Sequence, residues 1–429
     1  MLAEAAGLAA PVAGMPAPLA PVGGWSASHG LACPAASLWT HRWTSPRPLV
    51  LLTFYRSYLL AEDLAPIAAL ERALTARGFA VAALFVPSLK AAEARGWLRR
   101  WVAALAPAAI VNATAFAARD DDMGSPLDGD APVFQIALAT SGRAAWATAP
   151  RGLSPADLAM HVVLPEIDGR IFAGVASFKQ AGARDPALHF APRAHQPEPE
   201  RIAAIADRVA GWHRLAATPA EGRRVAIVLS TYPGKSWQMA HAVGLDAIAS
   251  AEAMLADWRD AGYATGPGAP LDRALADEVI AWPLADYHAA LATLPQSLRD
   301  DLAARWGAPD ADPAVRDGAF HFAATRRGHI SVALQPERGT VDDRAAEYHD
   351  LSLAPRHAYV AFYLWLRAQG LHALVHVGAH GTLEWLPGKA VALSGACWPE
   401  ALTGPLPISI PSSSTIRARR RRRGGGSAR

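Results

Sequence analysis

Short apolar runs alternate with segments of helical periodicity from residue 48 onward, and this alternation limits the possible folds more than any other feature. Leu49–Phe54 and Phe79–Val86 are apolar runs of strand length. Between them, Ile67, Leu70 and Leu74 recur at helical spacing. Strands that are apolar on both faces and separated by helices predict a parallel sheet covered by helices on both sides. A further helix is expected at 93–105, with strands at 109–112 and 133–138.

The same pattern continues in looser form over the rest of the chain. Strands are expected near 170–178, 224–229, 329–334 and 373–377, and helices over 199–215, 245–261, 286–306 (with a break at Pro295) and 357–368. The predicted fold class is therefore α/β, with several doubly wound parallel-sheet units in a multi-domain fragment. Proline and glycine density divides the chain into a connector (1–47), two α/β domains (48–180 and 181–285), a core (286–407) and a tail (408–429).

Cysteine content and hydropathy exclude several classes of protein. The chain of 429 residues has two cysteines, Cys33 and Cys397, too few and too far apart for a disulfide scaffold or a thiolate zinc site. No apolar run reaches the roughly 18 residues that a membrane span needs, and the N-terminus lacks the basic start of a signal peptide. We therefore expect a cytoplasmic protein with no membrane partner.

The positive charge of the chain is confined to its end. Seven arginines lie between Arg417 and Arg429, and no acidic residue follows Glu400. Removing them from the 41 basic residues leaves 34 against 38 acidic residues, a net charge of −4 rather than +3. The body of the chain therefore gives no reason to expect a nucleic-acid partner.

A possible phosphate-binding loop follows the strand expected at 224–229. It contains Gly234-Lys235-Ser236, but Leu229 stands where a P-loop has its first glycine, and Pro233 removes a backbone amide. An ordinary turn is the better interpretation, and we predict no nucleotide-binding site.

A stronger candidate site follows the strand expected at 373–377. His376, His380 and Glu384 occur at intervals of four residues, in a segment with glycines at 378 and 381. The glycines disfavour a helix, so the segment is better interpreted as a buried strand that runs into a loop. Imidazole and carboxylate groups together can bind a divalent ion or move protons. On spacing alone, a structural loop with His376 paired inside the core is the alternative.

Other polar residues are weaker candidates by themselves. Arg56 stands at the carboxyl end of the first strand, and His349 and His357 lie close together in the sequence. His161, after an apolar helix start, is expected to be a core histidine.

The segment His376–Pro407 (HVGAHGTLEWLPGKAVALSGACWPEALTGPLP) closely resembles the large subunits of ATP-dependent cobaltochelatase, relatives of the large subunits of magnesium chelatase. Most of residues 48–407 share the resemblance, and Trp385-Leu386 favours the cobalt branch. Other matching segments, in order, are FYRSYLL (54–60), LFVPSLK (84–90), IVNATAF (110–116), GLSPADLAMHVVLP (152–165), AHAVGLD (240–246), VALQPERG (332–339) and 348–366.

The resemblance implies a reaction and a set of site residues. Members of this family insert Co²⁺ into hydrogenobyrinic acid a,c-diamide, a corrinoid tetrapyrrole of aerobic cobalamin biosynthesis, while ATPase-type partner subunits hydrolyse ATP with Mg²⁺. Glu384 and His380 would then be catalytic, and His376 would join them as metal ligands. Arg56, His349 and His357 would contact the substrate. A magnesium chelatase H-type subunit and a non-catalytic tetrapyrrole-binding module are the alternatives.

The chain departs from the family pattern after Pro407. The family continues with a sequence close to His-Ile-Tyr-Pro-Phe-Ile-Val-Asn-Asp-Pro-Gly-Glu. When that segment is written in GC-rich codons and one base is dropped, it reads as residues Ile408 to Arg419 of this chain. We therefore expect an out-of-frame tail on an inactive, truncated fragment. Restoring one base near codon 407 of the coding DNA should reopen the family's frame; the absence of such a frame would refute this interpretation.

Overall fold

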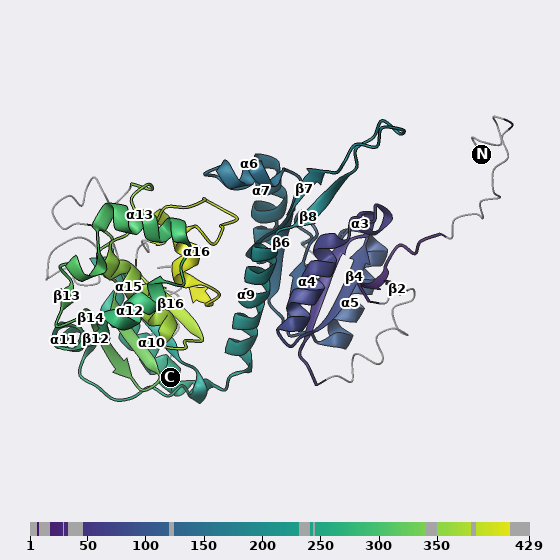
Figure 1. The fold of residues 1–429 in the computed structure, drawn as a ribbon. Helices are drawn as coiled ribbons and strands as arrows, with labels where there is room; N and C mark the ends of the chain where they lie inside the picture. Colours follow the sequence, from purple (N-terminus) through teal and green to yellow (C-terminus); the bar gives the residue numbers. More distant parts are fainter. Residues whose placement is uncertain are drawn as a thin grey trace, which may run out of the picture.

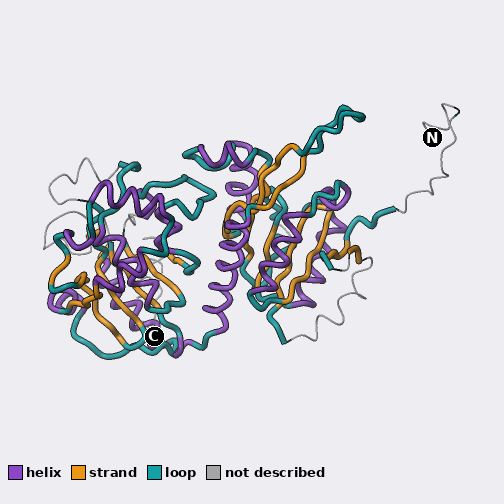
Figure 2. The backbone as a smooth tube through the Cα atoms, in the orientation of Figure 1, coloured by secondary structure: helices purple, strands orange, loops and turns teal. Residues whose placement is uncertain are grey.

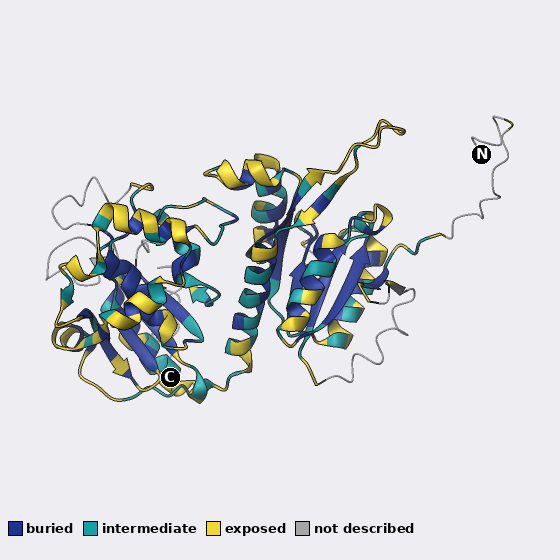
Figure 3. Cartoon of the chain, in the orientation of Figure 1, coloured by how far each residue is buried: buried dark blue, intermediate teal, exposed yellow. Residues whose placement is uncertain are grey.

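The computed structural model describes residues 7, 18–28, 30–32, 46–119, 124–230, 241–242, 245–339, 350–378 and 383–411. Its strands form two large sheets, each with helices packed on it, and the long helix α9 (Pro199–Ala217) lies between them (Figure 1). Figure 2 shows the strands of each sheet flanked by helices, and Figure 3 shows that these strands are largely buried.

The first sheet has the strand order β2-β1-β4-β3-β5-β6-β7-β8, and neighbouring strands from β4 to β7 are parallel. This confirms the predicted doubly wound sheet. Its strands are β1 (Gly23–Ser26), β2 (Gly30–Ala32), β3 (Leu49–Tyr55), β4 (Ala80–Val86), β5 (Ala109–Asn112), β6 (Val133–Ala139), β7 (Ile171–Ala181) and β8 (Arg193–Pro197).

Helices cover both faces of this sheet because the parallel strands are apolar on both sides. Helix α4 (Ala65–Ala76) buries Ile67, Leu70 and Leu74 on one face together with α9, and α5 (Ala92–Leu105) packs on the other face. The remaining helical segments are α3 (Arg56–Leu60), α6 (Arg143–Thr148), α7 (Pro155–Leu158), η1 (Ala159–Val163) and α8 (Leu164–Ile167).

The second sheet has the order β12-β14-β15-β9-β16-β17. The strands from β15 to β17 are parallel, whereas β14 joins β15 and β12 joins β14 in antiparallel pairs. Its strands are β9 (Val225–Leu229), β12 (Val279–Pro283), β13 (Val315–Arg316), β14 (Ala319–Arg327), β15 (Ile330–Leu334), β16 (Ala373–Val377) and β17 (Ile408–Ser409). A separate two-stranded sheet consists of β10 (His241–Ala242) and β11 (Leu245–Asp246).

Helix α15 (His357–Ala368) is the centre of the main core beneath the second sheet. Ten of its residues, from His357 to Leu366, are buried. The other helical segments of this unit are η2 (Ala220–Gly222), α10 (Ala247–Asp260), α11 (Leu271–Asp277), α12 (Leu284–Leu291), α13 (Gln296–Trp306), η4 (Pro309–Ala311), η5 (Leu383–Trp385) and α16 (Trp398–Thr403). The break predicted at Pro295 is confirmed, because α12 ends before this proline and α13 begins directly after it.

Strand pairing divides the chain differently from the predicted domains. The boundary at 180/181 falls inside β7, whose partner β8 also belongs to the first sheet. The boundary at 285/286 falls inside α12, shortly after β12, although β12 and the strands after it form one sheet. Part of the expected connector is β1, which pairs with β4 through Trp25. Polar and proline-rich segments suggested boundaries, but these segments are edge strands and turns of the two sheets.

The pH dependence of stability should reflect His161, which lies in η1. Its side chain is buried as predicted, but Nδ1 has no hydrogen-bond partner within the described part of the chain. Burial lowers the pKa of His161 to about 4. The unfolded chain therefore binds more protons between pH 6.5 and pH 4, so stability decreases as the pH falls through this window. At pH 5 the loss from this histidine is about 2 kcal/mol.

Urea unfolding of the wild type and of His161→Gln at pH 7.5 and pH 5 measures this contribution. The wild type should lose about 2 kcal/mol more than the variant over this interval. Equal losses in the two proteins would show that His161 is not buried in its neutral form.

Candidate functional site at the carboxyl edge of the second sheet

The candidate site lies where three parallel strands of the second sheet end. Ser230 follows β9, Gln335 follows β15, and Gly378 follows β16. The Ser230 amide donates to the Val377 carbonyl (3.1 Å), and the Gln335 amide donates to the Leu229 carbonyl (3.0 Å). The three strand ends are thus joined, and the carboxyl edge of a parallel sheet is the usual place for a ligand in α/β folds.

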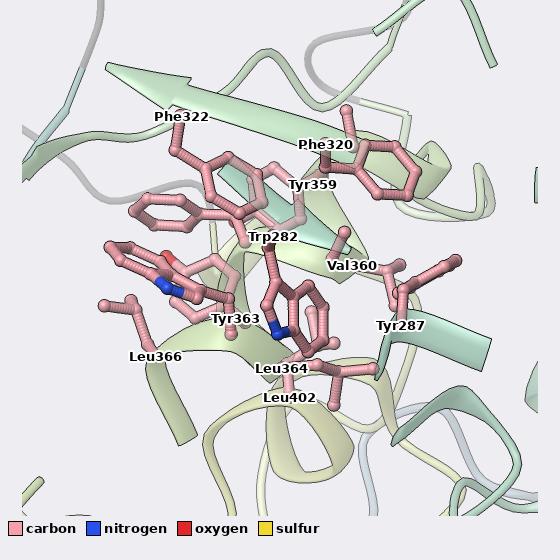
Figure 4. Close-up of a cluster of buried hydrophobic side chains, with 14 of the residues drawn as sticks. Trp282, Tyr287, Phe320, Phe322, Tyr359, Val360, Tyr363, Leu364, Leu366 and Leu402 are labelled. Carbon is pink, nitrogen blue, oxygen red and sulfur yellow. The ribbon is translucent and has the colours of Figure 1, made fainter. Parts of the chain in front are cut away.

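A buried polar network lies beneath this edge. His376 on β16 places Nε2 2.8 Å from the hydroxyl of Tyr363, and the two rings are nearly parallel. Gln335 donates from Nε2 to the hydroxyls of Tyr363 (2.6 Å) and Tyr359 (2.9 Å). Figure 4 shows Tyr359 and Tyr363, both on α15, among the aromatic side chains of the core. The network therefore connects the ends of two strands to the central helix.

His376 is the residue of this network that the sequence placed among the metal ligands. Burial lowers its pKa to about 4, so the imidazole is neutral near pH 7. Its Nε2 is engaged by Tyr363, and Nδ1 is buried with no partner among the described residues. This arrangement supports the alternative in which His376 is paired inside the core. Its role as a metal ligand stays a prediction.

Glu384 is exposed on the short helix η5, close to this network. Its charge contributes to raising the pKa of Tyr363, after the larger effects of burial and of Tyr359. The adjacent Leu386 is buried in the core. Glu384 thus presents a carboxylate to solvent from a backbone that is anchored below.

Arg338 provides much of this anchorage. Its guanidinium is buried and donates from Nη1 to the Trp385 carbonyl (2.8 Å) and from Nη2 to the carbonyls of Asp350 and Leu353. The Arg338 carbonyl in turn accepts from the Arg356 amide. One arginine therefore ties the turn that carries Glu384 to the segment before α15.

Two other predicted site residues, His357 and Arg56, make no hydrogen bond to this network that the described structure records. His357 is the first residue of α15 and is buried, with Nδ1 2.7 Å from the Tyr287 hydroxyl and Nε2 3.1 Å from the Gly307 carbonyl. Arg56 is the first residue of α3, directly after β3 of the first sheet, and donates to the carbonyls of Leu19 and Ala20. These contacts favour structural roles. Contacts of either residue with substrate stay predictions.

His349 and His380 lie outside the described residues, as does Gly234-Lys235-Ser236. Within the described ranges, no group of three or more His, Cys, Asp or Glu side chains could hold a metal ion. The metal-binding prediction for His380 and Glu384 is therefore not tested. Among the helices of the described part of the chain, none combines the length and the apolar character that crossing a membrane requires.

Four polar residues around the site were not predicted: Gln335, Arg338, Tyr359 and Tyr363. Two signals could have identified them. Gln335 and Arg338 occur in a polar segment directly after an apolar strand, and Tyr359 and Tyr363 are one helical turn apart in an otherwise apolar helix. Their partners are distant in sequence, so spacing alone could not pair them.

The segment after the site contacts α6 and α9, which pack on the first sheet. Lys389 Nζ donates to the carbonyls of Ala147 (2.9 Å) and Ala149 (3.2 Å), and the Trp146 indole donates to the Ala392 carbonyl (2.8 Å). Glu400 on α16 pairs with two arginines of α9, Arg201 (3.0 Å) and Arg208 (2.9 Å). The loop that carries Glu384 is thus followed by an anchored segment, Lys389–Glu400.

Comparisons with known proteins identify the family. The CobN/Magnesium Chelatase family matches residues 9–422. The chain is 40% identical over 400 residues to the aerobic cobaltochelatase subunit CobN of Sinorhizobium sp, covering 87% of this chain and 31% of that protein. It is 29% identical over 410 residues to the magnesium-chelatase H subunit of Rhodobacter capsulatus, covering 88% and 34% of the two chains.

A solved structure agrees with these matches. The catalytic subunit of cobaltochelatase from Mycobacterium tuberculosis superposes with a TM-score of 0.74 at 31% identity, over 92% of this chain and 34% of that one. The chain spans about a third of the length of these relatives. The family match extends beyond Pro407, and β17 pairs with β16, so the out-of-frame tail stays a prediction. On sequence and on fold, the chain belongs to the CobN/magnesium chelatase family.

Proposed function

We propose that this chain is the part of an ATP-dependent cobaltochelatase large subunit that brings a carboxylate to the tetrapyrrole and the metal. The reaction is the insertion of Co²⁺ into hydrogenobyrinic acid a,c-diamide, with release of the proton that the corrin ring nitrogens carry. The observation that carries the proposal is Glu384, an exposed carboxylate on a turn that Arg338 anchors at the carboxyl edge of a parallel sheet.

Metal insertion needs a group that accepts ring protons and a group that replaces water on the cation. A carboxylate can do both, because it is a hard oxygen ligand and a base. We assign these roles to Glu384, with His380 assisting as ligand or base and His376 as a third ligand. Arg56, His349 and His357 are proposed to contact the substrate, with Arg56 pairing a carboxylate side chain of the ring.

The energy for the reaction is proposed to come from partner subunits. ATPase-type subunits would hydrolyse ATP with Mg²⁺, which agrees with the incomplete phosphate loop at Gly234-Lys235-Ser236. We propose a cytoplasmic complex with no nucleic-acid or membrane partner.

Two alternatives are distinguishable. A magnesium chelatase H-type subunit would insert Mg²⁺ into a porphyrin; Trp385-Leu386 and the higher identity to the cobalt relative favour cobalt. A tetrapyrrole-binding module without turnover would fit a chain that spans a third of its relatives.

The experiment is a chelation assay with the frame-restored large subunit and its ATPase partners. Co²⁺ with hydrogenobyrinic acid a,c-diamide should give ATP-dependent insertion, and Mg²⁺ with protoporphyrin should give none. The reverse preference would support the magnesium alternative, and corrinoid binding without insertion would support the binding module. The 429-residue chain in the same assay should give no turnover.

A further inference from the structure

The first sheet contains a cavity at the position where its topology favours a ligand. Strand β3 is central, the next strand β4 lies on one side of it, and β5 lies on the other. The chain direction across the sheet therefore reverses at β3, and such a reversal opens a crevice at the carboxyl ends of the strands. The cavity has a volume of about 280 Å³. Tyr55 at the end of β3 and residues 88–90 and 115–117, which follow β4 and β5, line it.

The wall at 115–117 is held in place by hydrogen bonds. The Tyr55 hydroxyl donates to the Ala115 carbonyl (2.9 Å) and accepts from the Ala115 amide (3.0 Å). The Phe116 amide donates to the Met160 carbonyl (2.8 Å), and Arg170 donates to the Phe116 carbonyl (3.3 Å). The wall is therefore fixed before any ligand arrives.

A buried ladder of polar side chains supports this wall from below. Asn112 donates to Gln135 (2.7 Å), and Gln135 donates to the Thr114 carbonyl (2.7 Å). Arg170 reaches the same Gln135 side chain (3.0 Å) and pairs with Asp168 (2.6 Å). These groups bond to one another, so the ladder fixes the strand ends.

Phe116 has an unusual conformation at this wall. Its φ is 67°, in the left-handed region that aromatic residues rarely adopt, and its side chain is 46% exposed. Strained residues that the surrounding structure holds in place cluster at ligand sites. The strain leaves an aromatic ring in solvent beside the cavity, where a flat ring could stack on it.

The opposite wall carries a positive charge. Lys90 is exposed and makes no ion pair that the described structure records, and the Ser88 hydroxyl lies beside it in the lining. Helix α5 begins directly after this segment, and its N-cap Ala91 provides no side-chain acceptor for the first amides. Both features favour an anionic group at this wall.

We propose that this cavity binds a small flat ring carrying one anionic group. The ring lies against Phe116 and the alkyl groups of Leu89 and Leu164, and the anion meets Lys90 and Ser88. The proposal concerns the first sheet only and does not depend on the proposed function of Glu384.

Ligand-observed NMR with the 429-residue chain and three probes tests it: indole-3-acetate, indole and acetate. Indole-3-acetate should bind with a Kd of roughly 1 mM or tighter, as expected for a ligand of its size. Indole lacks the carboxylate and acetate lacks the aromatic ring, so each should bind at least about tenfold more weakly.

Variants locate the binding. Lys90→Met, at an exposed position, should weaken indole-3-acetate about tenfold, and Ala117→Phe should block the cavity. The matched control is Arg100→Met, an exposed cation at another position on α5, which should leave the Kd unchanged. Absence of indole-3-acetate binding, or equal affinity in Lys90→Met, Ala117→Phe and the wild type, would overturn the proposal. Equal binding of indole and indole-3-acetate would overturn the part of the proposal that assigns an anionic group to the ligand.

Discussion

Glu384→Gln in the frame-restored subunit should lower the rate of ATP-dependent cobalt insertion by at least about 100-fold. The amide keeps the size and shape of the side chain but loses the charge and the capacity to accept a proton. Because Glu384 is exposed and its backbone is anchored by Arg338, the change should not disturb the fold. Corrinoid binding, measured by absorbance titration, should stay within a factor of about three, since the role proposed for Glu384 is in metal delivery and proton removal.

The control for this variant is Glu278→Gln. Glu278 is exposed at the end of α11, in the same unit but on another element. The Glu278→Gln subunit should insert cobalt at the rate of the wild type. If Glu384→Gln inserts cobalt at a rate within a factor of about two of the wild type, Glu384 has no role in the chemical step, whatever the role of His380.

Glu400→Ala should reduce the free energy of unfolding by about 3 kcal/mol. Glu400 accepts from Arg201 (3.0 Å) and Arg208 (2.9 Å), and only 5% of the Arg201 side chain is exposed. Removing the carboxylate leaves the buried Arg201 guanidinium with Glu200 as its remaining acidic partner. The loss of a buried partner costs more than the loss of a surface pair. The contact joins α16 to α9, so its loss should also loosen the segment Lys389–Glu400.

The matched control is Glu198→Ala, which breaks the pair with Arg143. That arginine side chain is 51% exposed, so water compensates for the lost contact and the cost should be below about 1 kcal/mol. Guanidinium unfolding of the three proteins, followed by fluorescence and circular dichroism, gives the comparison. Equal destabilisation by the two variants would mean that the Glu400 contact is no stronger than a surface ion pair.

The parallel strands were predictable from the sequence because they are buried on both faces. Leu49–Tyr55 and Ala373–Val377 are mostly apolar runs of strand length, and helical periodicity identified the segments between such runs. Strands of the antiparallel edges were missed. Val279–Pro283 contains a proline and is mostly exposed, as expected of an edge strand, and Gly23–Ser26 lies in a segment rich in glycine and proline. For the same reason, the predicted domain boundaries do not coincide with the strand pairing of the two sheets.

The position of Glu384 was predictable because a strand that ends in a glycine loop marks the carboxyl edge of a sheet. The side chains that support it were not. Arg338 reaches the Trp385 carbonyl from 47 residues away, and Gln335 reaches Tyr363 from 28 residues away, so neither contact leaves a local pattern. For His357 and Arg56, the sequence suggested a site role that their contacts in the structure do not favour. Their residue types suggested substrate contacts, but their polar atoms bond within the protein.

The role proposed for Glu384 is tested most clearly by an experimental structure of the frame-restored large subunit with its cobalt-loaded corrinoid product. We predict that the macrocycle lies against the carboxyl ends of β9, β15 and β16, with the Glu384 carboxylate facing the cobalt. A product bound elsewhere in the protein, with Glu384 out of contact with both the macrocycle and the metal, would contradict it.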